Sequence, residues 1–183
     1  MDFEELEIPG AFKIKLKGFS DDRGFFARTF CKKEFQSIIG DVNLVQINHS
    51  MTSTKGTIRG MHFQKPPHME DKLIRVVKGE IYDVLVDLRA GSPTFLKWSP
   101  ILLSEENMDM VYIPKGCAHG FQSLTDDVIM IYHHTEYYMP NFDSGVLYND
   151  SKINIEWPEP PTVISDKDKS YPKIDSSFKA LEI

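Results

Sequence analysis

The sequence predicts an all-β protein, a sandwich or jelly-roll barrel with a few short helices. Short apolar runs recur along the chain and are separated by turn residues, which is typical of small all-β folds. The 12 Phe and 7 Tyr residues also favour strands. The 183 residues contain no linker or low-complexity segment, so we expect residues 1–183 to form a single domain with a well-filled core.

The individual elements follow from these apolar runs. We expect strands at residues 11–16, 25–30, 44–48, 57–63, 73–77, 81–87, 96–103, 110–113, 120–124 and 128–135. Lys78-Gly79 joins two of them as a tight hairpin. One helix is expected at residues 32–39, closed by Gly40. After Pro140 the chain is rich in Pro, Asp and Asn, which predicts an irregular segment with a short helix near residues 149–152.

Charge and cysteine content restrict the class of protein. The net charge is −6, which argues against a nucleic-acid-binding protein but not against a small anionic ligand. The two cysteines, Cys31 and Cys117, are far apart, so we expect no disulfide framework or structural zinc and a reduced, cytoplasmic setting. The acidic N-terminus predicts no signal peptide, and no apolar run is long enough to span a membrane.

Two histidine-containing segments and a lysine carry the chemical signal. Arg59 to Gln64 includes His62, which lies on an expected strand, and Ile113 to Phe121 includes His119, which lies at the start of another. Both histidines are expected to point into the barrel. Lys72 lies between the two segments. A base, a cation and a second imidazole lining one barrel indicate proton transfer on an anionic ligand.

The spacing of these segments resembles the two signature segments of the cupin jelly roll. The first is Gly56 followed by His62 and Gln64, and the second is Pro114, Gly116 and His119. In metal-binding cupins the first segment reads His-x-His, and here the second of these histidines is replaced by Gln64. His62, His119 and Glu70 would still make three ligands, so a metal-dependent cupin oxygenase or isomerase remains an alternative.

A wider set of short sequence motifs, the phrases given next, resembles those of the dTDP-4-dehydrorhamnose 3,5-epimerases over about residues 9–172. The phrases are Asp21-Asp22-Arg23-Gly24-x-Phe26, Gln46-x-Asn48-x-Ser50, Gly56-x-x-Arg59-Gly60-x-His62-x-Gln64, Lys72-Leu73, Gly79-x-x-x-Asp83-Val84-x-Val86-Asp87, Ile113-Pro114-x-Gly116-x-Ala118-His119-Gly120-Phe121, Tyr132, Tyr138-x-Pro140, Asp143-Ser144-Gly145, Trp157-Pro158 and Ser165-Asp166-Lys167-Asp168. The resemblance implies a homodimeric cupin that needs no cofactor and no metal. Its substrate would be a nucleotide-diphosphate 4-keto-6-deoxyhexose.

The resemblance also implies a role for each site residue. His62 would be the base, Asp168 would orient it, Lys72 would stabilise the enolate oxygen, and Tyr132 would be the acid on the opposite face. Other residues would bind the diphosphate, the sugar and the nucleobase: Arg23, Phe26, Gln46, Asn48, Arg59, His119 and Tyr138. His133 and His134 are expected at the surface or on a dimer face.

Some residues differ from the usual family pattern and leave the substrate open. They are Arg28 in place of Glu, Glu70-Asp71 in place of Gln and a small residue, His133 in place of Lys and Ile47 in place of Asp. These differences affect which sugar and which nucleotide are bound more than they affect the type of reaction. The alternatives are therefore an epimerase acting at C3 only, an epimerase of a GDP- or CDP-linked sugar or a heptose, a related ketoisomerase, and a barrel that binds sugars without catalysis.

Overall fold

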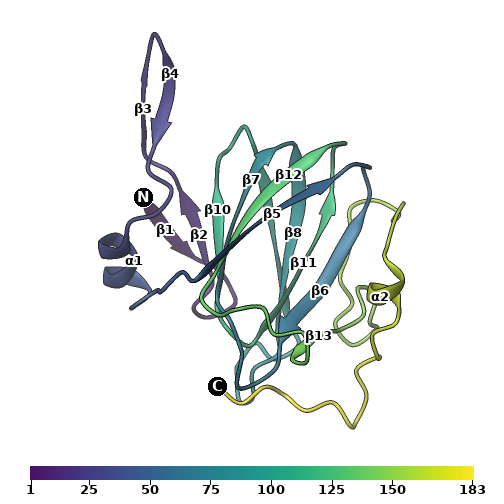
Figure 1. The fold of residues 1–183 in the computed structure, drawn as a ribbon. Helices are drawn as coiled ribbons and strands as arrows, with labels where there is room; N and C mark the ends of the chain where they lie inside the picture. The colour runs from purple at the N-terminus through teal and green to yellow at the C-terminus, as the bar shows by residue number, and fades with distance from the viewer.

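Two antiparallel β-sheets face each other in the computed structural model, which describes residues 1–183 (Figure 1). The six-stranded sheet has the order β1-β2-β10-β7-β12-β5, the five-stranded sheet has the order β13-β6-β11-β8-β9, and β3 and β4 form a separate hairpin. The bounds are β1 Asp2–Glu5, β2 Phe12–Lys15, β3 Gly18–Asp21, β4 Gly24–Ala27, α1 Lys32–Ile38, β5 Gln46–Thr52, β6 Ile58–Gln64, β7 Lys72–Lys78, β8 Glu80–Asp87, β9 Trp98–Ser104, β10 Met110–Ile113, β11 Cys117–Ser123, β12 Val128–His134, β13 Asp143–Gly145 and α2 Asp166–Lys169.

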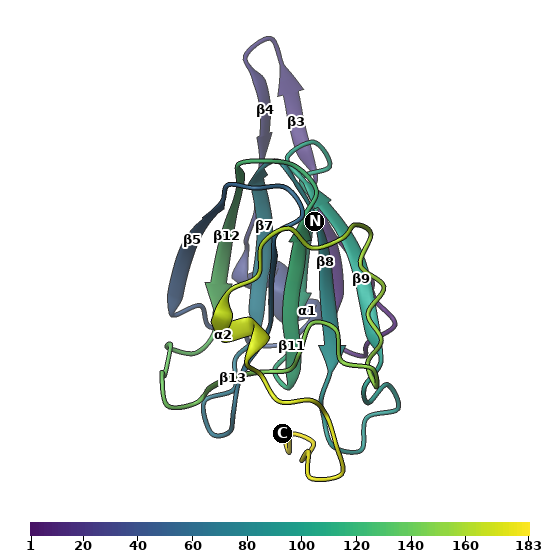
Figure 2. The ribbon, with the colours of Figure 1, turned by 90° about the vertical axis from the view of Figure 1, so that its right-hand side faces the viewer.

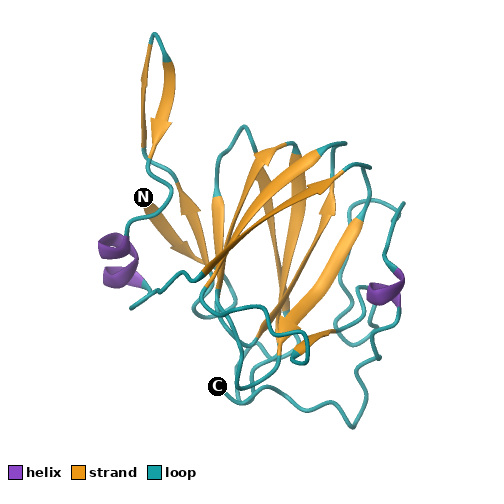
Figure 3. Ribbon diagram, in the orientation of Figure 1, coloured by secondary structure: helices purple, strands orange, loops and turns teal.

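Strands dominate and the two helices are short, which confirms the all-β prediction (Figure 3). The expected helix at 32–39 is present as α1, and every expected strand overlaps an observed one. Three short strands, β1, β3 and β13, were not predicted. Neither α1, with seven residues, nor α2, with four, is long and apolar enough to cross a membrane.

The helix expected near residues 149–152 is wrong, because this segment is a turn. Asp150 holds the turn by accepting from the main-chain N–H of Lys152 at 2.8 Å and of Ile174 at 2.7 Å. The second helix is instead α2, which begins after Ser165. The Ser165 hydroxyl accepts from the N–H of Asp168 at 3.0 Å, as an N-cap does.

The core between the two sheets follows the two-residue period of the strands. Inward positions are apolar over most of the sheet, with Ile74 and Val76 on β7, Val128 and Met130 on β12, and Phe121 on β11. The same faces continue into polar residues at one end of each strand: Lys72 on β7, Tyr132 and His134 on β12, and His119 on β11. This change from apolar to polar produces a pocket at one end of the sandwich.

Further chain segments cover the outer face of the five-stranded sheet and part of the outer face of the six-stranded sheet. The chain after β13 runs across the five-stranded sheet (Figure 2), where Val146, Ile153, Ile155, Ile174 and Leu181 join the outward residues of β6 and β8 in a second apolar cluster. On the other side, Phe35 of α1 packs with Ile14, Leu73, Met110 and Tyr112 of the six-stranded sheet. These layers leave the polar end of the inner core as the accessible part of the interior.

Asp87, at the end of β8, is expected to stabilise the fold in a pH-dependent way. Its carboxylate accepts from Arg89 at 2.8 Å, Ser92 at 2.5 Å and Thr94 at 2.6 Å. Burial alone would raise the pKa of Asp87, but these donors lower it from 3.8 to about 2. The stabilisation, about 2 kcal/mol, is present above pH 4 and is lost as the pH falls through 2.

Urea unfolding as a function of pH tests this expectation. Asp87→Asn should unfold at lower urea than the parent protein at pH 7, and the difference should shrink as the pH falls from 4 towards 2. Asp22→Asn, in an exposed turn, is the matched control and should match the parent. A difference between Asp87→Asn and the parent that does not change with pH would contradict the assignment.

Candidate active site

A pocket of about 540 Å³ opens at the polar end of the interior, between the two sheets. It is lined by Ile47, Asn48, His49, Ser50, Arg59, His62, Lys72, His119, Phe121, Tyr132 and His134, which come from β5, β6, β7, β11 and β12. A larger hollow, about 720 Å³, lies at the C-terminal segment, but it is lined by none of the predicted site residues. The smaller pocket is therefore the candidate site.

His62 is held at this pocket by a carboxylate from α2. Its Nε2 lies 2.8 Å from Asp168 Oδ1, and Asp168 Oδ2 accepts from the main-chain N–H of Gly60 at 3.1 Å. Burial raises the pKa of Asp168, but the hydrogen bonds from His62, Gly60 and Ser165 together bring it below its usual value. An ionised Asp168 fixes the proton of His62 on Nε2 and leaves the Nδ1 lone pair free.

The strand that carries His62 lies unusually close to β11. Gly60 has φ +139°, and a Cβ at this position would lie 2.5 Å from the Cα of Gly120. Only glycine satisfies both conditions. The close approach lets His62 and His119 face each other as cross-strand partners.

His119 is buried and neutral. Its Nε2 lies 2.7 Å from Asp83 Oδ1, and burial lowers the pKa of His119 although Asp83 opposes this effect. His119 therefore offers a ligand a hydrogen bond and not a positive charge. Positive charge at this end of the pocket comes from Arg59, whose guanidinium donates to Thr52 Oγ1 at 3.0 Å and to the carbonyl of Met51 at 3.2 Å.

Tyr132 reaches the pocket from the opposite sheet. Burial raises the pKa of Tyr132 to about 12, so its hydroxyl keeps the proton at neutral pH. The hydroxyl accepts from Ser50 Oγ at 3.4 Å, and its ring lies edge-on to His119 with a centroid distance of 6.2 Å. His62 on β6 and Tyr132 on β12 thus flank the pocket from the two facing sheets.

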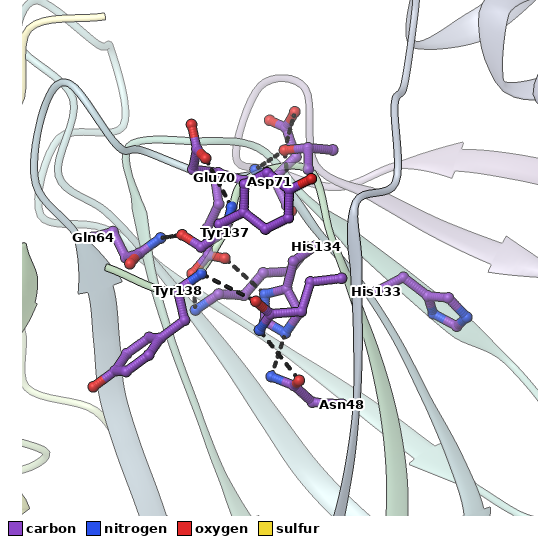
Figure 4. A network of polar contacts seen from close by, with 12 residues as sticks. Asn48, Gln64, Glu70, Asp71, His133, His134, Tyr137 and Tyr138 are labelled. Carbon is purple, nitrogen blue, oxygen red and sulfur yellow. Dashed lines mark hydrogen bonds and ion pairs between the residues drawn. The ribbon is translucent and has the colours of Figure 1, made fainter. Parts of the chain in front are cut away.

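Lys72 lies on the same sheet as Tyr132 and is paired with Glu70, its near neighbour in the sequence. Its Nζ is 3.4 Å from Glu70 Oε1 and 3.5 Å from the carbonyl of His62. Glu70 Oε2 lies 2.7 Å from Nδ1 of His134. The expectation that His134 lies at the surface is wrong: His134 lines the pocket, whereas His133 points away (Figure 4). The alternation of inward residues on β12 from Val128 to Tyr132 is the signal that identifies His134.

A smaller hollow of about 200 Å³ adjoins the first and shares His62, Lys72 and His134 with it. Tyr138 lines the hollow, and its hydroxyl donates to Asp143 Oδ2 at 3.2 Å. Gln46 does not line either hollow, but it hydrogen-bonds to Asn48 and to the N–H of Tyr138. The structure therefore brings nine of the eleven predicted site residues to one region: His62, Tyr132, Asp168, Lys72, Gln46, Asn48, Arg59, His119 and Tyr138.

Comparison with known proteins identifies the family of this chain. The sequence model of the dTDP-4-dehydrorhamnose 3,5-epimerase family matches residues 5–176. The chain belongs to this family. An epimerase of this name from Shigella flexneri is 44% identical over 180 residues, which are 97% of this chain and 99% of the relative. The family assignment makes the chain an isomerase.

Solved structures of the same family share the fold. The dTDP-4-dehydrorhamnose 3,5-epimerase from Bacillus anthracis, solved with TDP and PPi bound, superposes with a TM-score of 0.91 at 43% identity, covering 94% of this chain and 99% of that one. The epimerase from Legionella pneumophila, solved in complex with dTDP-4-keto-L-rhamnose, gives 0.88 at 37% identity, covering 93% and 90%. The predicted cupin-type jelly roll is thereby confirmed.

Two residues that the family resemblance places at the substrate do not reach the pocket of this epimerase. Arg23 and Phe26 lie in the β3–β4 hairpin, which projects beyond the two sheets (Figures 1 and 2). Arg23 is 89% exposed and contacts only Asp21. Phe26 and its neighbour Phe19 are 75% and 81% exposed. Within one chain these side chains line neither hollow of the candidate site.

The three ligands of the metal alternative are not assembled in this epimerase. His62 and His119 each direct Nε2 at their own carboxylate, and Glu70 is engaged by His134 and Lys72. No group of three or more His, Cys, Asp or Glu side chains is placed to hold a metal ion. The side-chain arrangement favours proton transfer between fixed groups over metal coordination.

Proposed function

We propose that this chain epimerises C3 and C5 of dTDP-4-dehydro-6-deoxy-D-glucose to give dTDP-4-dehydro-L-rhamnose. The observation that carries the proposal is the placement of His62 and Tyr132 on facing sheets, with Lys72 lining the same pocket. Inversion at a carbon requires a base on one face and an acid on the other. The family assignment and the dTDP-linked ligand in the Legionella structure support the substrate.

The proposed reaction runs through an enolate. The C4 ketone acidifies the protons at C3 and C5, and His62 Nδ1 removes one of them. The electron pair of the broken C–H bond moves to the C4 oxygen, where the Lys72 ammonium stabilises the negative charge. The Tyr132 hydroxyl then donates its proton to the same carbon from the opposite face. Solvent restores the proton of Tyr132 and takes that of His62, and the cycle repeats at the second carbon.

Proton NMR in D2O tests the proposal directly. The chelator-treated enzyme should place deuterium at both C3 and C5 of the dTDP keto sugar. Deuterium at C3 alone would make the chain a C3 epimerase. Folded protein that places none would refute the proposed substrate, and GDP- and CDP-linked keto sugars would be tried next. Loss of exchange on chelation would instead favour the metal-dependent alternative.

Asp168→Asn is expected to lower kcat by about 10³-fold or more, because it changes the tautomer of His62. The N–H of Gly60 requires an oxygen acceptor, so the amide oxygen of the substituted side chain would face Gly60. Its NH2 group would then face Nε2 of His62, which must become the acceptor, and the proton would move to Nδ1.

Stopped-time NMR assays of epimerisation measure the loss of kcat, and 15N NMR of the His62 ring reports which nitrogen carries the proton. A tautomer unchanged by Asp168→Asn, or kcat within a factor of about three of the parent, would contradict the role of Asp168.

We also propose that the enzyme acts as a homodimer in which the β3–β4 hairpin of one protomer completes the pocket of its partner. The support is the exposed set of Phe19, Arg23 and Phe26 on a hairpin that projects beyond the two sheets. An exposed aromatic cluster of this kind is typical of an interaction surface. Arg23 would supply positive charge for the diphosphate and Phe26 a surface for the base or the sugar.

Co-expression of two inactive variants tests the exchanged hairpin. A hairpin variant with Arg23→Ala and Phe26→Ala is expected to lose activity, as is His62→Asn. Heterodimers would contain one intact site, built from the His62 of one protomer and the hairpin of the other. About a quarter of the parental activity should return, since half of the randomly paired dimers carry one of two sites intact. If each hairpin served its own pocket, no activity would return.

A further inference from the structure

Glu70 and His134 form a buried pair beside Lys72 that the proposed reaction does not use. The side chains of Glu70, His134 and Lys72 are only 9%, 10% and 10% exposed. Each carboxylate oxygen of Glu70 has one partner: Oε2 lies 2.7 Å from His134 Nδ1, and Oε1 lies 3.4 Å from Lys72 Nζ. Placing a carboxylate, an imidazole and an ammonium in the interior is costly unless their charges and hydrogen bonds match.

The donor and the acceptor of each hydrogen bond that leads to this pair can be assigned in turn, starting from the main chain of Tyr138 (Figure 4). The main-chain N–H of Tyr138 can only donate, so the Gln46 atom 3.1 Å away is the oxygen Oε1. The Nε2 of Gln46 then donates to Oδ1 of Asn48 at 3.2 Å. The remaining amide nitrogen of Asn48 faces Nε2 of His134 at 3.2 Å. Because Asn48 donates there, Nε2 of His134 is an acceptor without a proton.

The protonation of the pair follows from this direction. With Nε2 as acceptor, the neutral ring of His134 carries its proton on Nδ1 and donates it to Glu70. Burial raises the pKa of Glu70, but the hydrogen bond from His134 and the charge of Lys72 together lower it below its usual value. Glu70 is therefore an ionised acceptor for both neighbours, and a single negative charge faces the single positive charge of Lys72.

We propose that Glu70 and His134 are positioning residues that hold the Lys72 ammonium at the pocket wall in the orientation that enolate formation requires. The inference rests on the proposed function of Lys72 and extends it. A lysine side chain has many rotamers, and a misplacement of about 1 Å costs on the order of 10²-fold in rate. A series of hydrogen bonds holds the Glu70 carboxylate so that its Oε1 faces Nζ of Lys72; the series runs from Tyr138 through Gln46, Asn48 and His134 to Glu70. The carbonyl of His62 also accepts from Nζ.

The tautomer of His134 is the first test, and it needs no substrate. Two-bond 1H–15N correlation of the histidine rings should show His134 protonated on Nδ1 only at neutral pH. The signal is assigned by its loss in His134→Asn. A ring protonated on Nε2, or on both nitrogens, would overturn the proposed series of hydrogen bonds, because Asn48 would have no acceptor.

The kinetic test compares substitutions that keep or remove the hydrogen bond between position 134 and Glu70, or the charge of Glu70. His134→Leu removes the donor, and Glu70→Gln turns an amide NH2 group towards Lys72. Both should lower kcat by about 10- to 100-fold, with KM changed by less than about threefold. His134→Asn keeps a donor for Glu70 and should retain kcat within about threefold of the parent. His133→Leu makes the same change on the outward face of the strand and is the matched control.

The 15N NMR signal of the Lys72 ammonium tests the positioning role of Glu70 and His134 independently of the proposed reaction. The 15N-ammonium resonance of Lys72 should be visible when the group is held and shielded from water, as in the parent and in His134→Asn. It should be lost in His134→Leu and Glu70→Gln, with folding checked by thermal melting. Equal kcat in His134→Leu and His134→Asn, or a Lys72 signal that persists without Glu70, would overturn the inference. Failure of the proposed function would instead appear as no proton exchange in the parent.

Discussion

Replacement of His62 by Asn is expected to abolish deuterium exchange at both C3 and C5 of the keto sugar, with a loss in rate of about 10²- to 10⁴-fold. Both exchanges should fail together, because in the proposed reaction one imidazole serves both carbons. His119, the cross-strand partner of His62, is buried and bound through Nε2 to Asp83, and burial lowers its pKa.

Asn is the informative replacement because it protects the fold. Its amide can still donate to Asp168, whereas Ala would leave a buried carboxylate without that partner. Calorimetric binding of dTDP should be unchanged, since the residues proposed to bind the diphosphate and the nucleobase do not include His62. Exchange within tenfold of the parent at either carbon, with dTDP binding intact, would show that another group is the base.

The fold was largely predictable because its strands carry the two-residue alternation that a buried sheet imposes. The strands that were missed, β1, β3 and β13, are short and have few buried residues, so the pattern gives no signal there. The misplaced helix has a different cause. Whether residues 149–152 form a turn depends on the bond between Asp150 and Ile174, which lie 24 positions apart.

The site was predictable to the extent that family motifs carry it. Asp168 alone, between Lys167 and Lys169, has the pattern of a solvated turn; its burial depends on the docking of α2 against β6. The sequence could not show that Glu70 and His134 meet, because their contact joins residues 64 positions apart. It also could not show that Arg23 and Phe26 lie outside the pocket, since the projection of the β3–β4 hairpin is a property of the folded chain.

His62 and Tyr132 lie on opposite sides of the pocket. Removal of a proton from the substrate and delivery of a proton from the other face can therefore be blocked separately. His62 is 34% exposed, so its captured proton can exchange with solvent before it returns to the substrate. Tyr132 is more deeply placed, and burial raises its pKa to about 12. A substitution at Tyr132 should therefore remove inversion without removing exchange.

Tyr132→Phe is accordingly expected to give deuterated substrate of unchanged configuration. His62 still forms the enolate and returns a deuteron to the face from which the proton was taken, while formation of the inverted product falls by about 10²- to 10⁴-fold. The Phe ring keeps the packing against His134, where the parental rings stack with centroids 6.3 Å apart. Proton NMR in D2O measures both quantities in one experiment, since signal loss reports exchange and ring coupling constants report configuration.

Tyr112→Phe makes the same chemical change on the outer face of the six-stranded sheet, where Tyr112 packs in the Phe35 cluster, and should leave both rates at parental values. Inverted product formed by Tyr132→Phe at a rate near the parental one would show that solvent or another group supplies the proton. Loss of exchange together with inversion would place Tyr132 on the same face as the base. Retained exchange with lost inversion is the only result compatible with a base and an acid on facing sheets.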